Sequence, residues 1–150
     1  ALDMNAMLME ITQTLAIQIQ QAGASVVIEP LPTCFADASQ LNQVFTNLLD
    51  NAIKYRDPAR PLELRVSGEL LGKSVRYVVS DNGPGIGKEF QGKVWELFHR
   101  LDPAGPIAGE GLGLTLARRI IDRLHGQIRL ESTLGEGSRF IIELPAVSTE

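Results

Sequence analysis

The most informative stretch of this chain is SVRYVVSDNGPGIG, residues 74–87. Its apolar side chains alternate through Val75, Tyr77 and Val79, which predicts a β-strand with one buried face. The same period of two puts Asp81 on that face, where the strand ends and a glycine-rich loop begins. The stretch therefore predicts a strand that carries a carboxylate to the edge of a sheet.

Two hairpins are predicted around this strand. Upstream, residues 61–71 alternate apolar and polar side chains as far as Leu70 and meet the strand through a Gly72-Lys73 turn. Downstream, residues 127–133 and 139–144 form a second hairpin around a Leu-Gly-Glu-Gly turn. Hairpins pair antiparallel, so most of the sheet is expected to be antiparallel.

Helices are predicted where apolar residues recur at helical spacing. They cover residues 4–21, a segment from an Asp37 or Ser39 cap to about Tyr55, residues 89–97 and residues 114–124. Residues 26–28 form a further short strand, and the Pro/Gly-rich segment 102–113 is interpreted as a mobile lid. The expected fold class is α+β, a two-layer α/β sandwich with a mixed, mostly antiparallel sheet and helices on one face.

Size and charge limit the functions that this chain can have. Its 150 residues fit one domain, and a net charge of −4 argues against non-specific binding to nucleic acid. A single cysteine, Cys34, excludes an internal disulfide and is expected to be buried. No stretch has the length of a membrane span, so we expect a cytoplasmic protein without direct membrane contact.

The second helix carries a line of amides beside its apolar stripe. Asn47 and Asn51 lie four residues apart on one face, next to the core residues Phe45, Leu48 and Leu49. A solvated polar face is one interpretation. The functional alternative is that an asparagine oxygen completes the shell of a Mg²⁺ ion shared with substrate phosphates.

Two glycine-rich loops suggest a nucleotide. After Asp81, alternate glycines let the backbone approach a flat ligand, and the carboxylate can accept a hydrogen bond from adenine N6; an Asx turn is the alternative. Residues 109–114, GEGLGL, open the last helix and present free N–H groups to phosphate; a flexible linker is the alternative.

Together these segments resemble the catalytic domain of two-component histidine kinases, in the GHKL superfamily of Bergerat-fold ATPases. The resemblance covers nearly the whole chain and is strongest to phytochrome-like sensor kinases. Residues 47–55 look like the asparagine box, 81–87 like the first glycine box and 109–114 like the second, with Phe98 in the phenylalanine box and 135–140 in the closing hairpin motif.

The resemblance implies ATP and Mg²⁺ as cofactors and assigns roles residue by residue. Asn51 would bind Mg²⁺, Asn47 and Lys54 would meet the phosphates, Tyr55 would stack near adenine and Asp81 would read adenine N6. Further nucleotide contacts are implied for Gly83, Gly85, Ile86, Gly111, Leu112, Gly113 and Leu114, for Ser138 through water, and for Arg100 at the γ-phosphate. For Tyr55, Ser138, Arg100 and Phe98 the respective alternatives are a core aromatic, a turn hydroxyl, a solvated charge and core packing.

One position separates kinase from hydrolase in this superfamily. Its hydrolases use a glutamate one turn before the Mg²⁺ asparagine, whereas this chain has Asn47, an amide that cannot act as a base. The resemblance therefore implies transfer of the γ-phosphoryl group to a histidine, with Asn47, Lys54 and Arg100 as the catalytic residues. The acceptor would lie on a separate dimerisation domain of the same full-length protein, and the receiver domain of a response regulator would be a further partner.

Some features depart from the family pattern, and other functions stay open. His99 and His125 lack the setting of a phosphoacceptor, and Glu110 puts a carboxylate beside the phosphates. One alternative is a nucleotide-binding signalling module without transfer activity. Another is a serine kinase of the anti-sigma-factor type.

Overall fold

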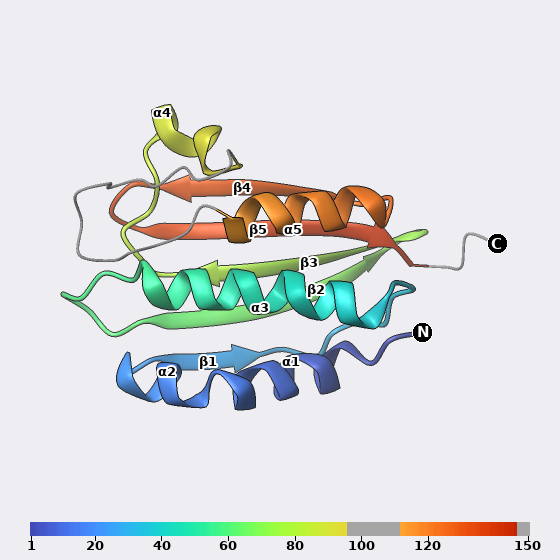
Figure 1. The fold of residues 1–150 in the computed structure, drawn as a ribbon, viewed down its shortest axis with the longest axis horizontal. Coiled ribbons are helices and arrows are strands. Elements are labelled where there is room, and N and C mark those ends of the chain that lie inside the picture. The colour runs from blue at the N-terminus through green and yellow to red at the C-terminus, as the bar shows by residue number, and fades with distance from the viewer. Residues whose placement is uncertain (96–111, 147–150) are drawn as a thin grey trace.

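The computed structural model describes residues 1–95 and 112–146, and the structural statements below refer to these residues. Figure 1 shows its helices and strands. In chain order they are α1 (Met4–Thr14), α2 (Ala16–Gln21), β1 (Ser25–Ile28), α3 (Ala38–Lys54), β2 (Glu63–Leu71), β3 (Ser74–Asp81), α4 (Lys88–Gln91), the 3-10 turn η1 (Lys93–Trp95), α5 (Leu112–Arg123), β4 (Gln127–Thr133) and β5 (Gly137–Pro145).

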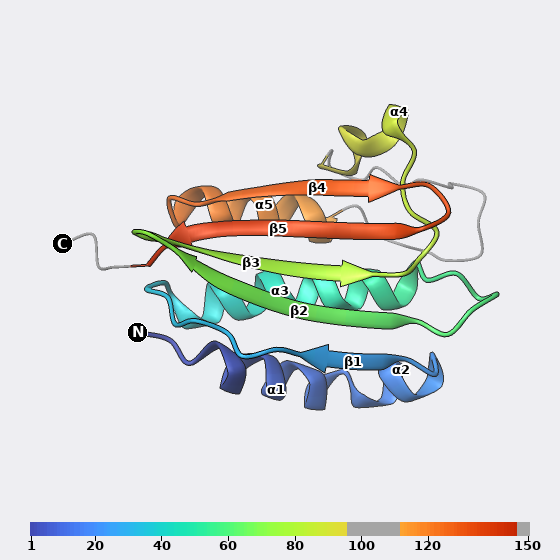
Figure 2. The same ribbon diagram turned by 180° about the vertical axis from the view of Figure 1, so that it is seen from behind.

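The strands form one mixed sheet in the order β1-β2-β3-β5-β4. Only β1 and β2 pair parallel among the described strands, and the other neighbours pair antiparallel. Helices α1, α3 and α5 lie on one face of the sheet, and Figure 2 shows the opposite face in front of them. The predicted two-layer α+β architecture is confirmed.

Both predicted hairpins are present. Leu71 pairs with Ser74 across the Gly72-Lys73 turn, where Gly72 has φ 63°, and Thr133 pairs with Gly137 across the second turn. The register of β3 and β5 sets Asp81 opposite Ser138. Two residues that lie far apart in sequence therefore meet at one end of the sheet.

The core lies between α3 and the centre of the sheet. Phe45 and Leu48 of the predicted apolar stripe are at most 1% exposed, and Phe45 meets Tyr77 edge-to-face with ring centroids 5.8 Å apart. The buried Tyr77 hydroxyl donates to the carbonyl of Pro32 at 2.5 Å. Cys34 is fully buried, as predicted.

The first predicted helix is two helices. The prediction of one helix over residues 4–21 was wrong because the chain turns at Leu15, with φ −95° and ψ 13°. Just before this turn, the Thr14 hydroxyl bonds to the carbonyl of Glu10 at 3.1 Å, a type of contact that bends helices. The predicted end at Gly23 is confirmed by its φ of 62°.

Other features also differ from the prediction. The helix expected over residues 89–97 is α4 (Lys88–Gln91) followed by the 3-10 turn η1 (Lys93–Trp95), and residues 96 and 97 lie outside the described ranges. Leu70, expected on the buried face of its strand, is 62% exposed because it lies near the hairpin tip, beyond Val66, the last buried residue of β2. Helix α5 begins two residues earlier than expected, at Leu112, and is followed by His125 with φ 63°. Alternation and periodicity give the type of an element better than they give its ends.

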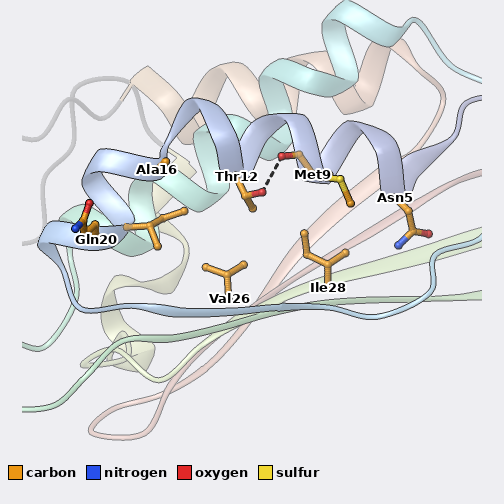
Figure 3. A pocket seen from close by; sticks show the side chains of 8 residues that line it. Asn5, Met9, Thr12, Ala16, Gln20, Val26 and Ile28 are labelled. Atoms are coloured by element: carbon orange, nitrogen blue, oxygen red, sulfur yellow. Dashed lines mark hydrogen bonds between the residues drawn. The ribbon is translucent and has the colours of Figure 1, made fainter.

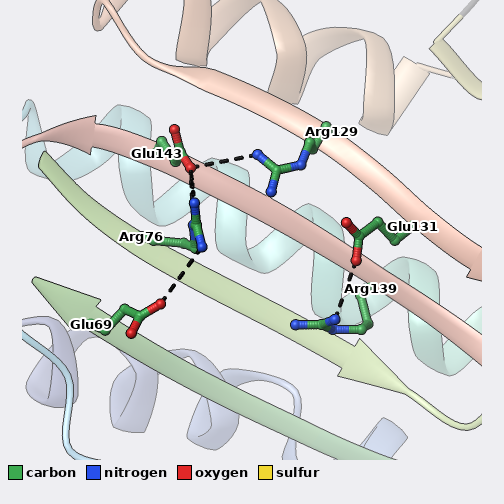
Figure 4. A network of polar contacts seen from close by, with 6 residues as sticks. All are labelled: Glu69, Arg76, Arg129, Glu131, Arg139 and Glu143. Atoms are coloured by element: carbon green, nitrogen blue, oxygen red, sulfur yellow. Dashed lines mark hydrogen bonds and ion pairs between the residues drawn. The ribbon is translucent and has the colours of Figure 1, made fainter. Parts of the chain in front are cut away.

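The face of the sheet opposite the helices is covered by its own charged side chains (Figure 4). Arg76 donates twice to Glu143 Oε1, at 2.9 and 2.7 Å, and Arg139 donates to Glu131 at 3.2 Å. Val78 and Ile141 pair on this same face, yet they are only 8% and 3% exposed. No helix of the described chain lies over this face, and long charged side chains can cover apolar surface with their stems.

No helix in the described ranges is long and apolar enough to span a bilayer.

Candidate functional site

The site is centred on Asp81, at the end of β3 between β2 and β5. Its Oδ1 accepts the backbone N–H of Gly83 at 2.9 Å. Burial raises the pKa of this carboxyl, against the lowering effect of the Gly83 and Ser138 backbone N–H groups. Within the described residues its partners are backbone groups rather than a lysine or arginine, so acceptor capacity remains for a ligand.

Two glycines of the loop after Asp81 lie close to neighbouring atoms. Gly85 has φ 73°, and a Cβ there would collide with the Thr133 carbonyl at the end of β4. A Cβ on Gly83 would lie 2.9 Å from Asp81 Oδ1. The predicted need for positive φ is thus met at Gly85, whereas a side chain at Gly83 would press on the Asp81 carboxylate.

A pair of serines supports the loop from the second hairpin. Ser132 Oγ accepts the backbone N–H of Ile86 at 2.7 Å and lies 2.8 Å from Ser138 Oγ. Ser138 is only 7% exposed and is the one buried polar side chain in the described core. The sequence pointed to Ser138 and missed Ser132, although the two residues pair across β4 and β5.

A second residue that the sequence did not reveal is Arg60, in the loop between α3 and β2. Its guanidinium donates to the carbonyls of Asn82 at 2.7 Å, Gly83 at 2.6 Å and Gly135 at 3.1 Å. It therefore joins the loop that follows Asp81 to the turn between β4 and β5. A lone arginine between a helix and a strand gave no pattern by which this contact could be predicted.

The amide face of α3 leads to the same loop. Asn47 and Asn51 are half-buried, and Lys54, on the same face, pairs with Asp50 at 2.9 Å with 49% of its side chain exposed. The carbonyl of Tyr55 is 3.7 Å from where a Cβ on Gly83 would lie. The end of α3 therefore lies against the loop that holds Asp81.

The remaining predicted contacts are placed only in part. Arg100, Gly111, Phe98 and most of the proposed lid lie outside the described residues. Leu112 and Gly113 begin α5, and Leu114 is 8% exposed within the core. Because the Leu114 side chain is buried, only its backbone N–H is available to an anion at the start of α5.

The donors at this site fit a magnesium ion that is shared with a ligand. No group of three or more His, Cys, Asp or Glu residues that could hold a metal is found in the part of the chain that the structure describes. Asn51 offers one amide oxygen, and Mg²⁺ commonly takes few protein ligands and completes its octahedron with phosphates and water. These residues suit a metal that arrives with a phosphate group.

A groove of about 520 Å³ lies elsewhere, between α1–α2 and β1 (Figure 3). Its walls include Met9, Ile19, Val26 and Ile28. None of the predicted site residues lines it, so the sequence motifs and this groove belong to different parts of the molecule.

Comparison with known proteins gives one family. The model described as histidine kinase-, DNA gyrase B-, and HSP90-like ATPase matches residues 36–148. Cyanobacterial phytochrome A of Nostoc sp. is 37% identical over 133 residues, which are 89% of this chain and 17% of that protein. The chain therefore spans about a sixth of this curated relative.

Solved structures agree in fold. The catalytic domain of the histidine kinase ThkA, in a nucleotide-free form, superposes with a TM-score of 0.82 at 26% identity, over 97% of this chain and 93% of that one. Full-length ShkA in complex with AMPPNP gives a TM-score of 0.82 at 28% identity, over 99% of this chain and 31% of that one.

Proposed function

This chain belongs to the histidine kinase-, DNA gyrase B-, and HSP90-like ATPase family, and on that premise we propose that residues 1–150 form the ATP-binding catalytic domain of a sensor histidine kinase. The domain binds Mg-ATP and transfers the γ-phosphoryl group to a histidine on a separate dimerisation domain of the full-length protein. A response regulator receiver domain is the next acceptor. The complex of ShkA with AMPPNP supports the choice of an adenine nucleotide.

The observation that carries this proposal is the half-buried Asp81 carboxylate. It costs free energy to bury an ionisable group without a cationic partner, and a ligand that donates a hydrogen bond to it offsets part of that cost. The exocyclic amine of adenine is such a donor. Gly85 lets the loop after Asp81 lie directly against the second hairpin, which fixes the position of the loop that borders the carboxylate.

The phosphate tail would run from this pocket towards α3 and the start of α5. Asn51 would hold Mg²⁺, which when bound supplies charge neutralisation at the phosphate oxygens. Lys54 would exchange its exposed pair with Asp50 for a phosphate, since an exposed ion pair contributes only about 0–1 kcal/mol. Asn47 would meet the phosphates from one turn earlier on α3.

The same face of α3 favours transfer over hydrolysis. Asn47 has no basic group with which to activate water, so the γ-phosphoryl group is kept for another acceptor. Catalysis then rests on positioning and charge neutralisation. We expect slow hydrolysis of ATP by the domain alone.

The test is a phosphotransfer assay with γ-labelled ATP. The chain is mixed with the histidine-bearing dimerisation domain of its full-length protein, and the stability of the label to acid and base is measured. Acid-labile, base-stable phosphate on the dimerisation domain is expected, and it should be lost when the acceptor histidine is replaced.

Other outcomes identify the alternatives. ATP binding without label on the dimerisation domain would indicate a signalling module that lacks transfer activity. Acid-stable label on a serine of another protein would indicate a serine kinase. Absence of ATP binding would exclude all three functions.

A further inference from the structure

Arg60 contacts two of the loops at the candidate pocket. Its Nε donates to the carbonyl of Asn82 at 2.7 Å, and its Nη2 donates to Gly83 at 2.6 Å and to Gly135 at 3.1 Å. The acceptors belong to two loops that are more than fifty residues apart in sequence. One planar guanidinium thus fixes the relative position of both loops.

The contact with Asn82 reaches Asp81 through a single peptide group. The carbonyl of Asn82 and the N–H of Gly83 belong to the same planar unit, so fixing one fixes the direction of the other. That N–H donates to Asp81 Oδ1 at 2.9 Å. Arg60 therefore fixes the carbonyl end of this peptide group, and the N–H at its other end bonds to the Asp81 carboxylate.

The second hairpin is joined to the same arrangement. The Gly135 N–H donates to the carbonyl of Pro84 at 2.6 Å, next to the Gly135 carbonyl that Arg60 contacts. Arg60 uses its donors on carbonyls and forms no ion pair with Asp81, so it does not occupy the acceptor sites of the carboxylate. Hydrogen bonding at a carbonyl also polarises the peptide and strengthens its N–H as a donor.

The fold does not depend on this arginine alone. The side chain of Asn82 also anchors the loop, since its Oδ1 accepts the N–H of Glu63 at 2.8 Å and its Nδ2 donates to Pro61 at 3.0 Å. The end of β3 should thus stay in register when Arg60 is replaced. What changes is the direction of the Gly83 N–H.

We infer that Arg60 is a positioning residue for recognition of the purine base, acting on Asp81 through the Asn82–Gly83 peptide. This inference rests on the proposed function, because it assigns the Asp81 carboxylate to the base. Replacement of Arg60 then weakens binding of the base and the preference for adenine over guanine. Contacts to the phosphates are unaffected.

The test compares Arg60→Ala with Arg65→Ala, an exposed arginine whose partner is Glu29 and which lies outside the pocket. Calorimetric titration with Mg-ATP and Mg-GTP should show about 10-fold weaker ATP binding and a reduced preference for ATP in Arg60→Ala only. In an Asp81→Asn background, Arg60→Ala should add little, because the two residues act in one chain of contacts. Melting curves verify that each variant is folded, and Arg60→Gln replaces Arg60→Ala if the alanine variant does not fold.

Wild-type ATP affinity in Arg60→Ala would overturn the inference, and so would a full additive loss in the Asp81→Asn background. An unchanged preference for ATP over GTP would do the same. These failures are distinct from failure of the proposed function. In that case the wild-type chain does not bind ATP, or Asp81→Asn binds it as well as the wild type does.

Discussion

In the absence of a ligand, the charged Asp81 side chain lowers the free energy of unfolding of the domain. Its pKa is raised above the ordinary value of 3.8, so the folded state binds more protons than the unfolded state between the ordinary and the raised value. Stability therefore falls as pH rises through that window, and above the raised pKa the whole cost is present. We interpret Asp81 as a residue that lowers the stability of the domain because its carboxylate serves to bind a ligand.

Asp81→Asn should consequently separate binding from stability. ATP affinity should fall by about 10- to 100-fold, since a charge-assisted hydrogen bond is lost. The nucleotide-free melting temperature at pH 7 should stay the same or rise, and this gain should shrink as the pH falls below the raised pKa. Titration calorimetry and scanning calorimetry measure the two effects, with Asp122→Asn on the exposed side of α5 as the control. A lower melting temperature together with unchanged affinity would contradict this account.

Gly85→Ala tests the close approach of the two loops. Positive φ alone costs about 1–2 kcal/mol for alanine. The collision with the Thr133 carbonyl should add roughly 1–3 kcal/mol to the loss in the free energy of unfolding. Gly23→Ala is the matched control, because Gly23 has φ 62° and no atom within 4 Å of its Cβ position. Denaturant unfolding compares the two, and equal losses would mean that the approach is looser than described.

The sequence led to Asp81 and Ser138 but not to the residues that support them. The place of Asp81 follows from alternation along one strand, whereas a role for Ser138 was implied only by the family resemblance. Arg60 contacts Gly135 over 75 positions of sequence, and Ser132 contacts Ile86 over 46. Such contacts exist only once the sheet order is fixed, and no local pattern encodes that order.

At the level of elements, α3 begins at a well-defined cap. Asp37 Oδ1 accepts the N–H of Gln40 at 3.0 Å and the hydroxyl of Ser39 at 2.8 Å. Of the two predicted caps, Asp37 is the one that the structure uses. The Gln40 N–H is the main cause that lowers the pKa of this carboxyl.

Asp37→Ala should lower the melting temperature at neutral pH, because an N–H at the start of α3 loses its acceptor. A lowered pKa in the folded state means that the contribution is present above the ordinary value of 3.8 and is lost as pH falls through the folded value. The difference between wild type and variant should therefore shrink in acid. Ser39→Ala should have the smaller effect, and the reverse order would assign the cap to Ser39.

Sequence periodicity gave the order and type of the elements and failed at their interruptions. It predicted both hairpins from their glycine-containing turns, which have two residues in the first hairpin and three in the second, because a short turn determines the register of its strands. It did not predict the turn at Leu15, because the apolar stripe continues through it as if the helix were unbroken. The Thr14 hydroxyl bonds next to the turn, but a threonine is also found within unbroken helices, so its presence in the sequence did not reveal the turn.

For the whole molecule, the family predicted from the motifs is confirmed, and so is the two-layer fold. A two-layer sandwich leaves one face of its sheet without helices. Here Val78 and Ile141 are nonetheless buried on that face, which also carries Arg76 and Glu143 (Figure 4). We expect the stems of long side chains such as that of Arg76 to cover this second hydrophobic surface of the sheet.

Arg76→Ala should destabilise the domain by about 1–2 kcal/mol by uncovering this surface. Arg76→Met keeps the stem, loses the pair with Glu143, and should stay within about 0.5 kcal/mol of wild type, since partly exposed ion pairs contribute little. Urea unfolding at low and high salt measures both variants. If Arg76→Met lowers the free energy of unfolding as much as Arg76→Ala does, the charge of Arg76 rather than its apolar stem stabilises the domain.

The turn at Gly72-Lys73 lies at the start of β3, and Asp81 lies at its end. A strand of this length separates the two by roughly 26 Å. Lys73 is exposed, and its carbonyl is anchored by the N–H of Ala146 at 2.8 Å, so the turn is a fixed part of the fold. A fluorophore attached there would sit within energy-transfer range of a dye-labelled nucleotide and could report its arrival in real time without obstructing it.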